Sequence, residues 1–185
     1  MTRAIYHAAT TLDGYLATDD DSLDWLFAVP GAAEAEADFG AFLAGVGALV
    51  MGSATYEWLL WHEGLLDAPE KWQAIYGTRP TFVFTSRPLA LVPGADIRLV
   101  AGGVDVHWPA IRNAAGADDV WIVGGGDLAG QVIDAGLLDE IRLSVAPATL
   151  GSGKPLLPRV LGADRLTLLD ARRAGQFAEV VYAVS

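Results

Sequence analysis

Hydrophobic and polar positions follow two rhythms along this chain. Short apolar runs, typical of buried strands, alternate with longer stretches in which apolar residues recur at helical spacing. The runs predict strands at residues 3–10, 47–51, 81–86, 97–102 and 120–123. The helical spacing predicts helices at residues 33–45, 53–60, 68–77, 104–116 and 127–136. Three further strand-like runs, at 139–150, 166–174 and 177–184, follow with no helix between them.

This order of elements predicts an α/β fold. Strands that alternate with helices form a largely parallel sheet with helices on both faces, which gives three layers. The closing strands, which no helix separates, are expected to pair as an antiparallel edge, so the sheet is mixed. A chain of 185 residues with 52% hydrophobic residues suits one core, and we expect a single domain over residues 1–185.

Charge and the scarcity of metal ligands exclude several function classes. A formal net charge of -11 opposes binding to nucleic acid, which depends on Lys and Arg neutralising phosphates. The chain has no cysteine, and its three histidines, His7, His62 and His107, do not lie at a metal-ligand spacing. We therefore expect no metal site and no nucleic-acid partner, and a small molecule is the expected ligand.

A membrane location is also not expected. The segment 39–56 has no charged residue, but glycine and hydroxyl residues interrupt it, so it fits a turn and a buried strand better than a membrane span. The N-terminus lacks the long apolar core and the cleavage site of a signal peptide. These features predict a cytoplasmic protein.

Three consecutive glycines in "VWIVGGGDLAG", residues 120–130, form the most conspicuous motif. Gly124, Gly126 and Ala129 match the dinucleotide pattern G-x-G-x-x-G/A between a strand and a helix. In a Rossmann domain this pattern opens the first βαβ unit, whereas here most of the chain precedes it, which argues against that fold. Bare backbone before a helix N-terminus still suits a pyrophosphate, and the alternative is that the glycines only permit a tight turn.

A second strand-to-helix junction has the same character. The strand at 48–51 ends at Gly52, and the next helix offers the hydroxyl groups of Ser53 and Thr55 beside free backbone N–H groups. Two such junctions could hold one extended cofactor. Ordinary helix capping explains Ser53 and Thr55 equally well.

Five ordered motifs carry a resemblance to a known family: "TLDGYLA", "MGSATYE", "TSRPL", "WIVGGGDLAGQ" and "GLLDEIRLSVAPATLGSGKPLL". In this order and spacing the chain resembles the dihydrofolate reductase superfamily, including the C-terminal reductase domain of the bifunctional riboflavin-biosynthesis deaminase-reductase. The resemblance covers residues 3 to 158. It implies an eight-stranded mixed sheet with NADPH across the strand ends, and a homodimer.

The resemblance also implies the residues that bind the cofactor. Its phosphates would lie at Gly52, Ser53, Ala54 and Thr55. Its nicotinamide and pyrophosphate would lie at Gly124, Gly125, Gly126, Asp127 and Leu128, where family members often have a cis Gly–Gly bond. The adenosine ribose would lie by Thr85, Ser86 and Arg87, and the nicotinamide would also contact Ala8, Ala9, Leu16 and Ala17.

One departure from the family pattern affects the choice of cofactor. The family commonly has an arginine where this chain has Ser53, so a phosphate-binding cation is missing. Arg87 is then the candidate to favour NADPH, because a guanidinium can bind the 2′-phosphate with two hydrogen bonds. The alternative is that Arg87 is an exposed loop residue, and NADH is not excluded.

The resemblance is less informative about the substrate side. Folate-reducing members imply an acidic residue on the first helix, and Asp38 is the best match. A carboxylate there holds and helps to protonate the pterin ring, but we favour a solvated Asp38. Asp13 is the conspicuous acidic residue of the first loop, although "LDG" is also a turn sequence. Trp25 would wall the substrate pocket, or simply anchor its loop.

Two further departures concern the riboflavin-type activity. Members with that activity often have a basic residue at the position of Tyr15 and a glutamate at the position of Val123. Both differences weigh against a strict role in riboflavin biosynthesis. We expect an NADPH-dependent reductase of the 5-amino-6-(5-phosphoribosylamino)uracil reductase type, with hydride transfer to a C=N or C=O carbon of a small heterocycle. Dihydrofolate reduction is the first alternative, and a non-catalytic nucleotide-binding module on the same fold is the second.

Overall fold

The structure is a computed structural model that describes residues 2–30 and 39–185. Residues 33–38 of the helix predicted at 33–45 therefore lie outside the described residues, and residues 39–43 are helical. The strands are β1 (Ala4–Thr11), β2 (Tyr15–Ala17), β3 (Val46–Gly52), β4 (Thr81–Phe84), β5 (Ile97–Val100), β6 (Asp119–Gly124), β7 (Glu140–Ala146), β8 (Lys154–Pro155), β9 (Leu166–Ala174) and β10 (Phe177–Val184). The helices are α1 (Asp24–Phe27), α3 (Ser53–His62), α4 (Glu70–Tyr76), α5 (Val104–Ala115), α6 (Gly126–Asp134) and the 3-10 turn η1 (Ala163–Arg165).

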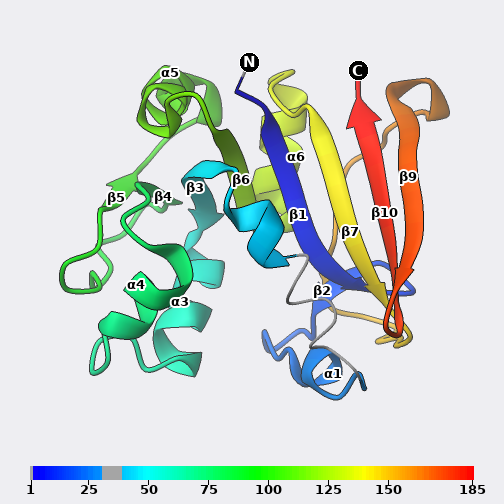
Figure 1. Cartoon of the computed structure of the whole chain (residues 1–185), viewed down its shortest axis with the longest axis horizontal. Helices are drawn as coiled ribbons and strands as arrows, with labels where there is room; N and C mark the ends of the chain where they lie inside the picture. Colours follow the sequence, from blue (N-terminus) through cyan, green and yellow to red (C-terminus); the bar gives the residue numbers. More distant parts are fainter. Residues whose placement is uncertain (1, 31–38) are drawn as a thin grey trace.

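Eight strands form one twisted sheet in the order β5-β4-β3-β6-β1-β7-β10-β9 (Figure 1). The six strands from β5 to β7 are parallel, and β10 and β9 add an antiparallel edge. The predicted mixed, mostly parallel sheet is confirmed. Because the six strands run in the same direction, their carboxyl ends share one edge of the sheet, opposite the edge that carries both chain termini.

Helices cover both faces of the sheet, as predicted. On one face α5 and α6 pack their apolar sides against β1, β3 and β6 in a core that includes Trp108 and Ile111. On the other face α3 and α4 enclose a second core, in which Trp72 and Tyr56 are fully buried. This second core reaches only as far as Trp121 on β6, so no helix of that core covers β7 and β10.

Two local elements were not predicted from the sequence. Strands β2 and β8 pair antiparallel, and the backbone N–H of Leu156 donates to the carbonyl oxygen of Gly14 at 2.9 Å. Helix α1 and the residues after it pack on the ends of β7 and β10, where Val29 contacts Ala146 and Phe177. Both elements are too short to give a periodic signal, and the contacts that hold them come from distant parts of the chain.

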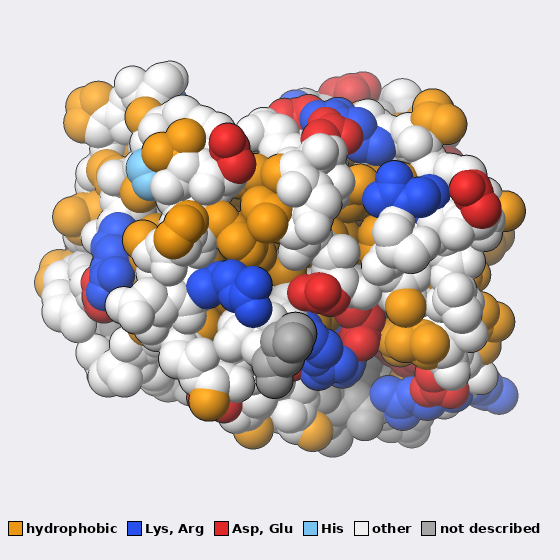
Figure 2. All heavy atoms as spheres, turned by 90° about the horizontal axis from the view of Figure 1, so that it is seen from above, with side chains coloured by type: hydrophobic (Ala, Val, Ile, Leu, Met, Phe, Trp, Pro, Cys, Tyr) orange, Lys and Arg blue, Asp and Glu red, His pale blue; other side chains and the backbone are white. Residues whose placement is uncertain are grey.

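Charged groups are mixed on the surface. Seen from above, acidic and basic side chains adjoin one another, and this face has no extensive basic patch (Figure 2). Within the described residues, no group of three or more His, Cys, Asp or Glu side chains is arranged to hold a metal ion. None of the helices described is long and apolar enough to cross a membrane.

The contact between β3 and the end of α5 gives a test of the fold. A Cβ atom at Gly47 would lie 2.2 Å from the backbone carbonyl oxygen of Ala115, so Gly47→Ala must displace α5. Overpacking of this kind lowers the free energy of unfolding by about 1–3 kcal/mol. Urea unfolding followed by circular dichroism measures the change. Gly40→Ala is the matched control because its Cβ would meet nothing within 4 Å, and an equal loss in both variants would contradict the packing.

Candidate active site

Loops at the carboxyl ends of neighbouring parallel strands form a groove of about 380 Å³. In open α/β sheets, ligands bind outside these strand ends. The groove is lined by the residues that follow β3, β4, β5 and β6: Gly52, Ser53, Ala54, Phe84, Thr85, Ser86, Val100, Ala101, Gly102, Gly125, Asp127, Leu128 and Gln131. Small side chains predominate, so backbone N–H groups are accessible along the groove.

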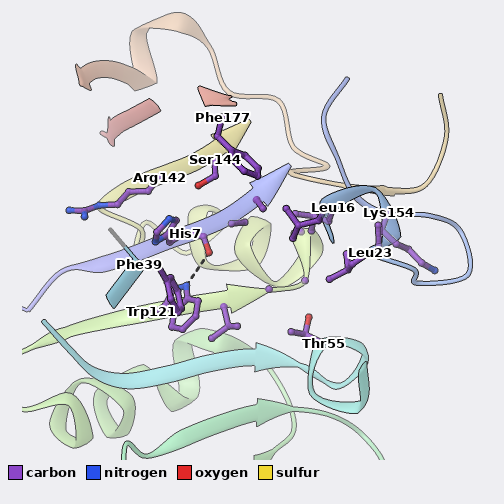
Figure 3. Close-up of a pocket in the computed structure, with 18 of the residues that line it drawn as sticks. His7, Leu16, Leu23, Phe39, Thr55, Trp121, Arg142, Ser144, Lys154 and Phe177 are labelled. Atoms are coloured by element: carbon purple, nitrogen blue, oxygen red, sulfur yellow. Dashed lines mark hydrogen bonds between the residues drawn. The ribbon is translucent and has the colours of Figure 1, made fainter. Parts of the chain in front are cut away.

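A larger cavity of about 1130 Å³ lies on the sheet face that α3 and α4 leave uncovered (Figure 3). Its floor is formed by β1, β7 and β10, with His7, Ser144 and Glu179 among the floor residues. Its walls are aromatic: Trp25, Phe27, Phe39, Phe42, Trp58, Trp121 and Phe177. A concave site with a mostly apolar surface and several polar groups is the usual form of a small-molecule site.

The groove and the large cavity adjoin each other. Ala54, Gly125 and Asp127 line both of them. An elongated ligand could therefore place one end among the helix N-termini of the groove and the other end among the aromatic side chains of the large cavity.

Each of the three consecutive glycines has a structural reason. A Cβ at Gly124 would lie 2.8 Å from the Thr55 hydroxyl oxygen, and a Cβ at Gly126 would lie 2.2 Å from the carbonyl oxygen of Pro155. Gly125 has a φ of 93°, which L side chains rarely adopt. The Gly124–Gly125 peptide is trans, unlike the cis bond that the resemblance implied. Close packing thus requires the glycines whether or not a ligand binds.

Two helix N-termini meet at the groove. Helix α3 begins after Gly52 and α6 begins after Gly125, and neither N-terminus has a side-chain cap. The first N–H groups of a helix have no partner within the helix, and the helix dipole adds partial positive charge there. The pair of ends is therefore suited to the phosphates of an extended ligand.

Most of the residues expected at the cofactor line these two spaces. Ala9, Leu16, Thr55, Gly124 and Gly126 line the large cavity. The groove contains the remaining ones except Arg87: Gly52, Ser53, Ala54, Thr85, Ser86, Gly125, Asp127 and Leu128.

Arg87 lies outside both spaces. Its guanidinium donates two hydrogen bonds to the Glu57 carboxylate, one of them from Nη1 to Oε1 at 2.8 Å. This hydrogen bonding raises the pKa of Arg87. To bind a 2′-phosphate, Arg87 would first have to leave Glu57.

The three candidates for the substrate side have different positions. Trp25 lines the large cavity, and its buried indole Nε1 has no hydrogen-bond partner among the described residues. Asp13 lines neither space: its carboxylate accepts hydrogen bonds from the Thr11 hydroxyl at 2.6 Å and from the N–H of Gly151 at 2.7 Å. These bonds lower the pKa of Asp13 and tie together two loops, a structural role. Asp38 lies outside the described residues.

Sequence reasoning did not identify the polar floor of the large cavity. His7 on β1 is in register with Arg142 on β7, and Ala9 is in register with Ser144. The strand period of two places His7 and Ala9 on one face, and likewise Arg142 and Ser144. Nothing in the sequence indicated that β1 and β7 are neighbours, because each pair of facing residues on them is 135 positions apart in the chain.

His7 is held as a neutral group. Its ring packs edge-on against the Phe42 ring, with 4.5 Å between the two ring centres. Its Nδ1 atom is buried and has no hydrogen-bond partner among the described residues. The Trp121 indole N–H donates a hydrogen bond to the backbone carbonyl oxygen of His7 at 3.0 Å (Figure 3). Burial, with a contribution from the charge of Arg142, lowers the pKa of His7 to about 4. The imidazole is consequently uncharged at neutral pH.

Beside His7, two arginines neutralise a buried carboxylate. Glu140, only 5% exposed, accepts hydrogen bonds from Arg142 and from Arg3, the latter at 3.0 Å. The Arg142 guanidinium also lies over the Phe42 ring, 5.4 Å from its centre. The cation on the cavity floor is therefore already bound by protein groups.

Comparison with known proteins agrees with this architecture. The chain is 26% identical over 180 residues to the uncharacterized protein YwjB of Bacillus subtilis, with 97% of each chain covered. A solved structure of a Shewanella sp. PV-4 protein assigned to riboflavin biosynthesis is 27% identical, with a TM-score of 0.77, and covers 100% of this chain and 99% of its own. Dihydrofolate reductase from Enterococcus faecalis, solved with NADP(H), has a TM-score of 0.63 at 17% identity, covers 99% and 96%, and shares the fold.

These comparisons confirm the resemblance to dihydrofolate reductase-like and riboflavin-type reductases. The model of the RibD C-terminal domain family matches residues 65–178, which include β4 to β9, the three glycines and α6. The match extends over more than half of the chain, and the protein therefore belongs to the RibD C-terminal domain family of riboflavin-type reductases.

Proposed function

We propose that this protein is a nicotinamide-dependent reductase whose cofactor lies along the groove and whose substrate occupies the large cavity. The observation that carries this proposal is that the two spaces adjoin each other at Ala54, Gly125 and Asp127, which line both. The reaction is hydride transfer to a C=N or C=O carbon of a small heterocycle. Membership of the family supports the riboflavin-type reductase over the dihydrofolate reductase alternative.

The residues of the groove fit a dinucleotide cofactor. The uncapped N-termini of α3 and α6 would hold its phosphates, and the Thr85 and Ser86 side chains lie where a ribose could accept or donate hydrogen bonds. A Cβ at Gly52 or Gly102 would meet nothing within 4 Å, so the groove is open beside both residues. When bound, the cofactor supplies the hydride.

The protein's own groups would bind, orient and desolvate the substrate. The Trp121, Phe39 and Phe42 rings form one wall and exclude water from the reacting carbon. The opposite end is closed by Trp25 and Phe177, which belong to the α1 region and β10. Leu16 on β2 also lines the cavity (Figure 3).

His7 and Ser144 would give the substrate its polar contacts. Both lie on the cavity floor, on the neighbouring strands β1 and β7. An uncharged imidazole offers one donor and one acceptor, so it can orient a heterocycle without requiring a charge on it. We assign His7 this positioning role, and we propose NADPH as the cofactor and a homodimer as the assembly.

Cofactor binding can be tested with a charge placed at the shared boundary. Ala54→Glu puts a carboxylate in the first turn of α3, where it would repel the cofactor phosphates but favour the helix dipole. NADPH at 100 times its Kd should stabilise the wild type by about 2.7 kcal/mol, or roughly 5–10 °C in Tm, and this shift should disappear in the variant. Differential scanning fluorimetry with NADPH and NADH measures it.

The matched control for this experiment is Val106→Glu. Val106 is an exposed residue in the first turn of α5 and lines neither the groove nor the large cavity. The Val106→Glu variant should keep the full increase in Tm that NADPH causes in the wild type. A wild-type protein that neither cofactor stabilises would overturn the proposed function.

The Arg87–Glu57 pair gives a test of cofactor preference. Glu57→Gln removes the carboxylate that holds the guanidinium, so Arg87 becomes available to a 2′-phosphate. We expect the ratio of NADPH to NADH affinity to rise by about three-fold. Isothermal titration with both cofactors measures the ratio, and an unchanged ratio would mean that Arg87 does not contact the 2′-phosphate.

The neutral His7 predicts a pH dependence of stability. Its pKa in the folded protein is about 4, below the ordinary value of 6.5, so between these values the unfolded chain binds a proton that the folded chain does not. Stability should therefore fall as the pH drops from 6.5 to 4, by up to about 3 kcal/mol from this residue. In urea unfolding measured between pH 4 and 6.5, His7→Gln should make the free energy of unfolding less dependent on pH. The control is His107→Gln, at a residue that lines neither space, and it should leave the pH dependence unchanged.

A further inference from the structure

The large cavity has three cationic side chains in its lining, and each is paired with a carboxylate. Arg142 is bound to Glu140, Lys154 lies 3.6 Å from Asp21, and Arg172 lies 3.8 Å from Asp170. A phosphate group on a ligand would have to compete with these carboxylates for every cation. Binding of a phosphate usually depends on cations that are available to form charge-assisted hydrogen bonds.

The carboxylates also outnumber the cations. Besides the three in these pairs, the lining contains Glu179, which lies in register with Arg172, and Asp127, which is paired with Arg159. The lining itself therefore holds five carboxylates and three cations, and Arg3 and Arg159, which lie outside the lining, pair with Glu140 and Asp127. A carboxylate beside each lining cation weakens the attraction of that cation for an anionic ligand.

The remaining lining favours a flat, uncharged ring system. The Trp121 ring meets Phe39 and Phe42 edge-on, at 5.3 and 5.6 Å, and leaves an aromatic surface toward the cavity (Figure 3). The buried Trp25 Nε1 and His7 Nδ1 atoms have no hydrogen-bond partner in the described structure. Stacking surfaces combined with neutral polar groups suit a heteroaromatic ring that has carbonyl or ring-nitrogen atoms.

We propose that the large cavity binds a planar, uncharged heteroaromatic substrate and discriminates against the same compound bearing a phosphate. This inference rests on the proposed function, since the cavity is a substrate site only if the cofactor lies along the groove. The proposed substrate differs from that of a reductase that acts on a compound with a phosphoribosyl group. The specificity arises from the acidic partners of Arg142, Lys154 and Arg172, which leave the cations neutralised.

The experiment uses riboflavin and riboflavin 5′-phosphate as probes, because they share one planar heterocycle and differ by a single phosphate. Equilibrium dialysis of the full-length protein at low ionic strength gives the two Kd values. We expect riboflavin to bind at least ten-fold more tightly than its phosphate. Equal affinity, tighter binding of the phosphate or binding of neither probe would overturn the proposal.

A pair of variants tests the electrostatic cause. Asp170→Asn removes one negative charge from the cavity wall, next to Arg172 on edge strand β9, and should lower the riboflavin preference at least three-fold. Asp96→Asn is the matched control: Asp96 pairs with Arg98 at the same two-residue spacing at the opposite edge strand, β5, outside both spaces. A preference that Asp170→Asn leaves unchanged, or that both variants lower equally, would contradict the assigned cause.

The two proposals fail separately. Dialysis needs neither the cofactor nor turnover, so equal binding of riboflavin and its phosphate, in a protein that NADPH still stabilises, overturns this inference alone. A protein that prefers riboflavin but that neither NADPH nor NADH stabilises would overturn the proposed function and leave the charge selectivity of the cavity in place.

Discussion

The parallel pairing of β1 with β6 on one side and β7 on the other is the constraint on which the site depends. Parallel strands have their carboxyl ends at the same edge, so this pairing brings the loops after β1, β3, β4 and β6 together. It also places His7 beside Arg142. The antiparallel strands β10 and β9 extend the sheet beyond the helices, and the resulting uncovered floor is what makes room for the large cavity.

Packing and ligand access are combined in the same glycines. Gly124 makes room for Thr55, and Gly126 makes room for the backbone at residues 155–156. This packing draws the start of α3, the start of α6 and the β8 loop to one point, where Gly125 borders both the groove and the large cavity. A bulky residue at any of the three positions would disturb the fold, so substitution there cannot separate binding from stability. Ala54, which is exposed and borders both spaces, can separate them.

The charge arrangement explains how a member of this family can differ in substrate while retaining the fold. The groove depends on backbone N–H groups and small side chains, which constrain sequence only locally. The large cavity is lined by side chains from β1, β7, β9 and β10, and under the proposed specificity a change in their charges would change the ligand while the sheet is retained. In this chain, each cation in the lining of the large cavity is paired with a carboxylate, and these pairs belong to the side chains that can change while the fold is retained.

The sequence by itself determined the α/β class, most of the strands and helices, and the two glycine-containing junctions, because periodicity and helix N-termini are local properties of the chain. Most of the residues that line the groove could also be predicted, because the ordered motifs indicated the family. Only the tertiary structure decided that Arg87 is held by Glu57, that Asp13 ties two loops together, and that His7, Arg142 and Ser144 form one floor. The physical reason is that these relations depend on which strands are neighbours and on which charges pair, and both are set by contacts between residues far apart in the chain.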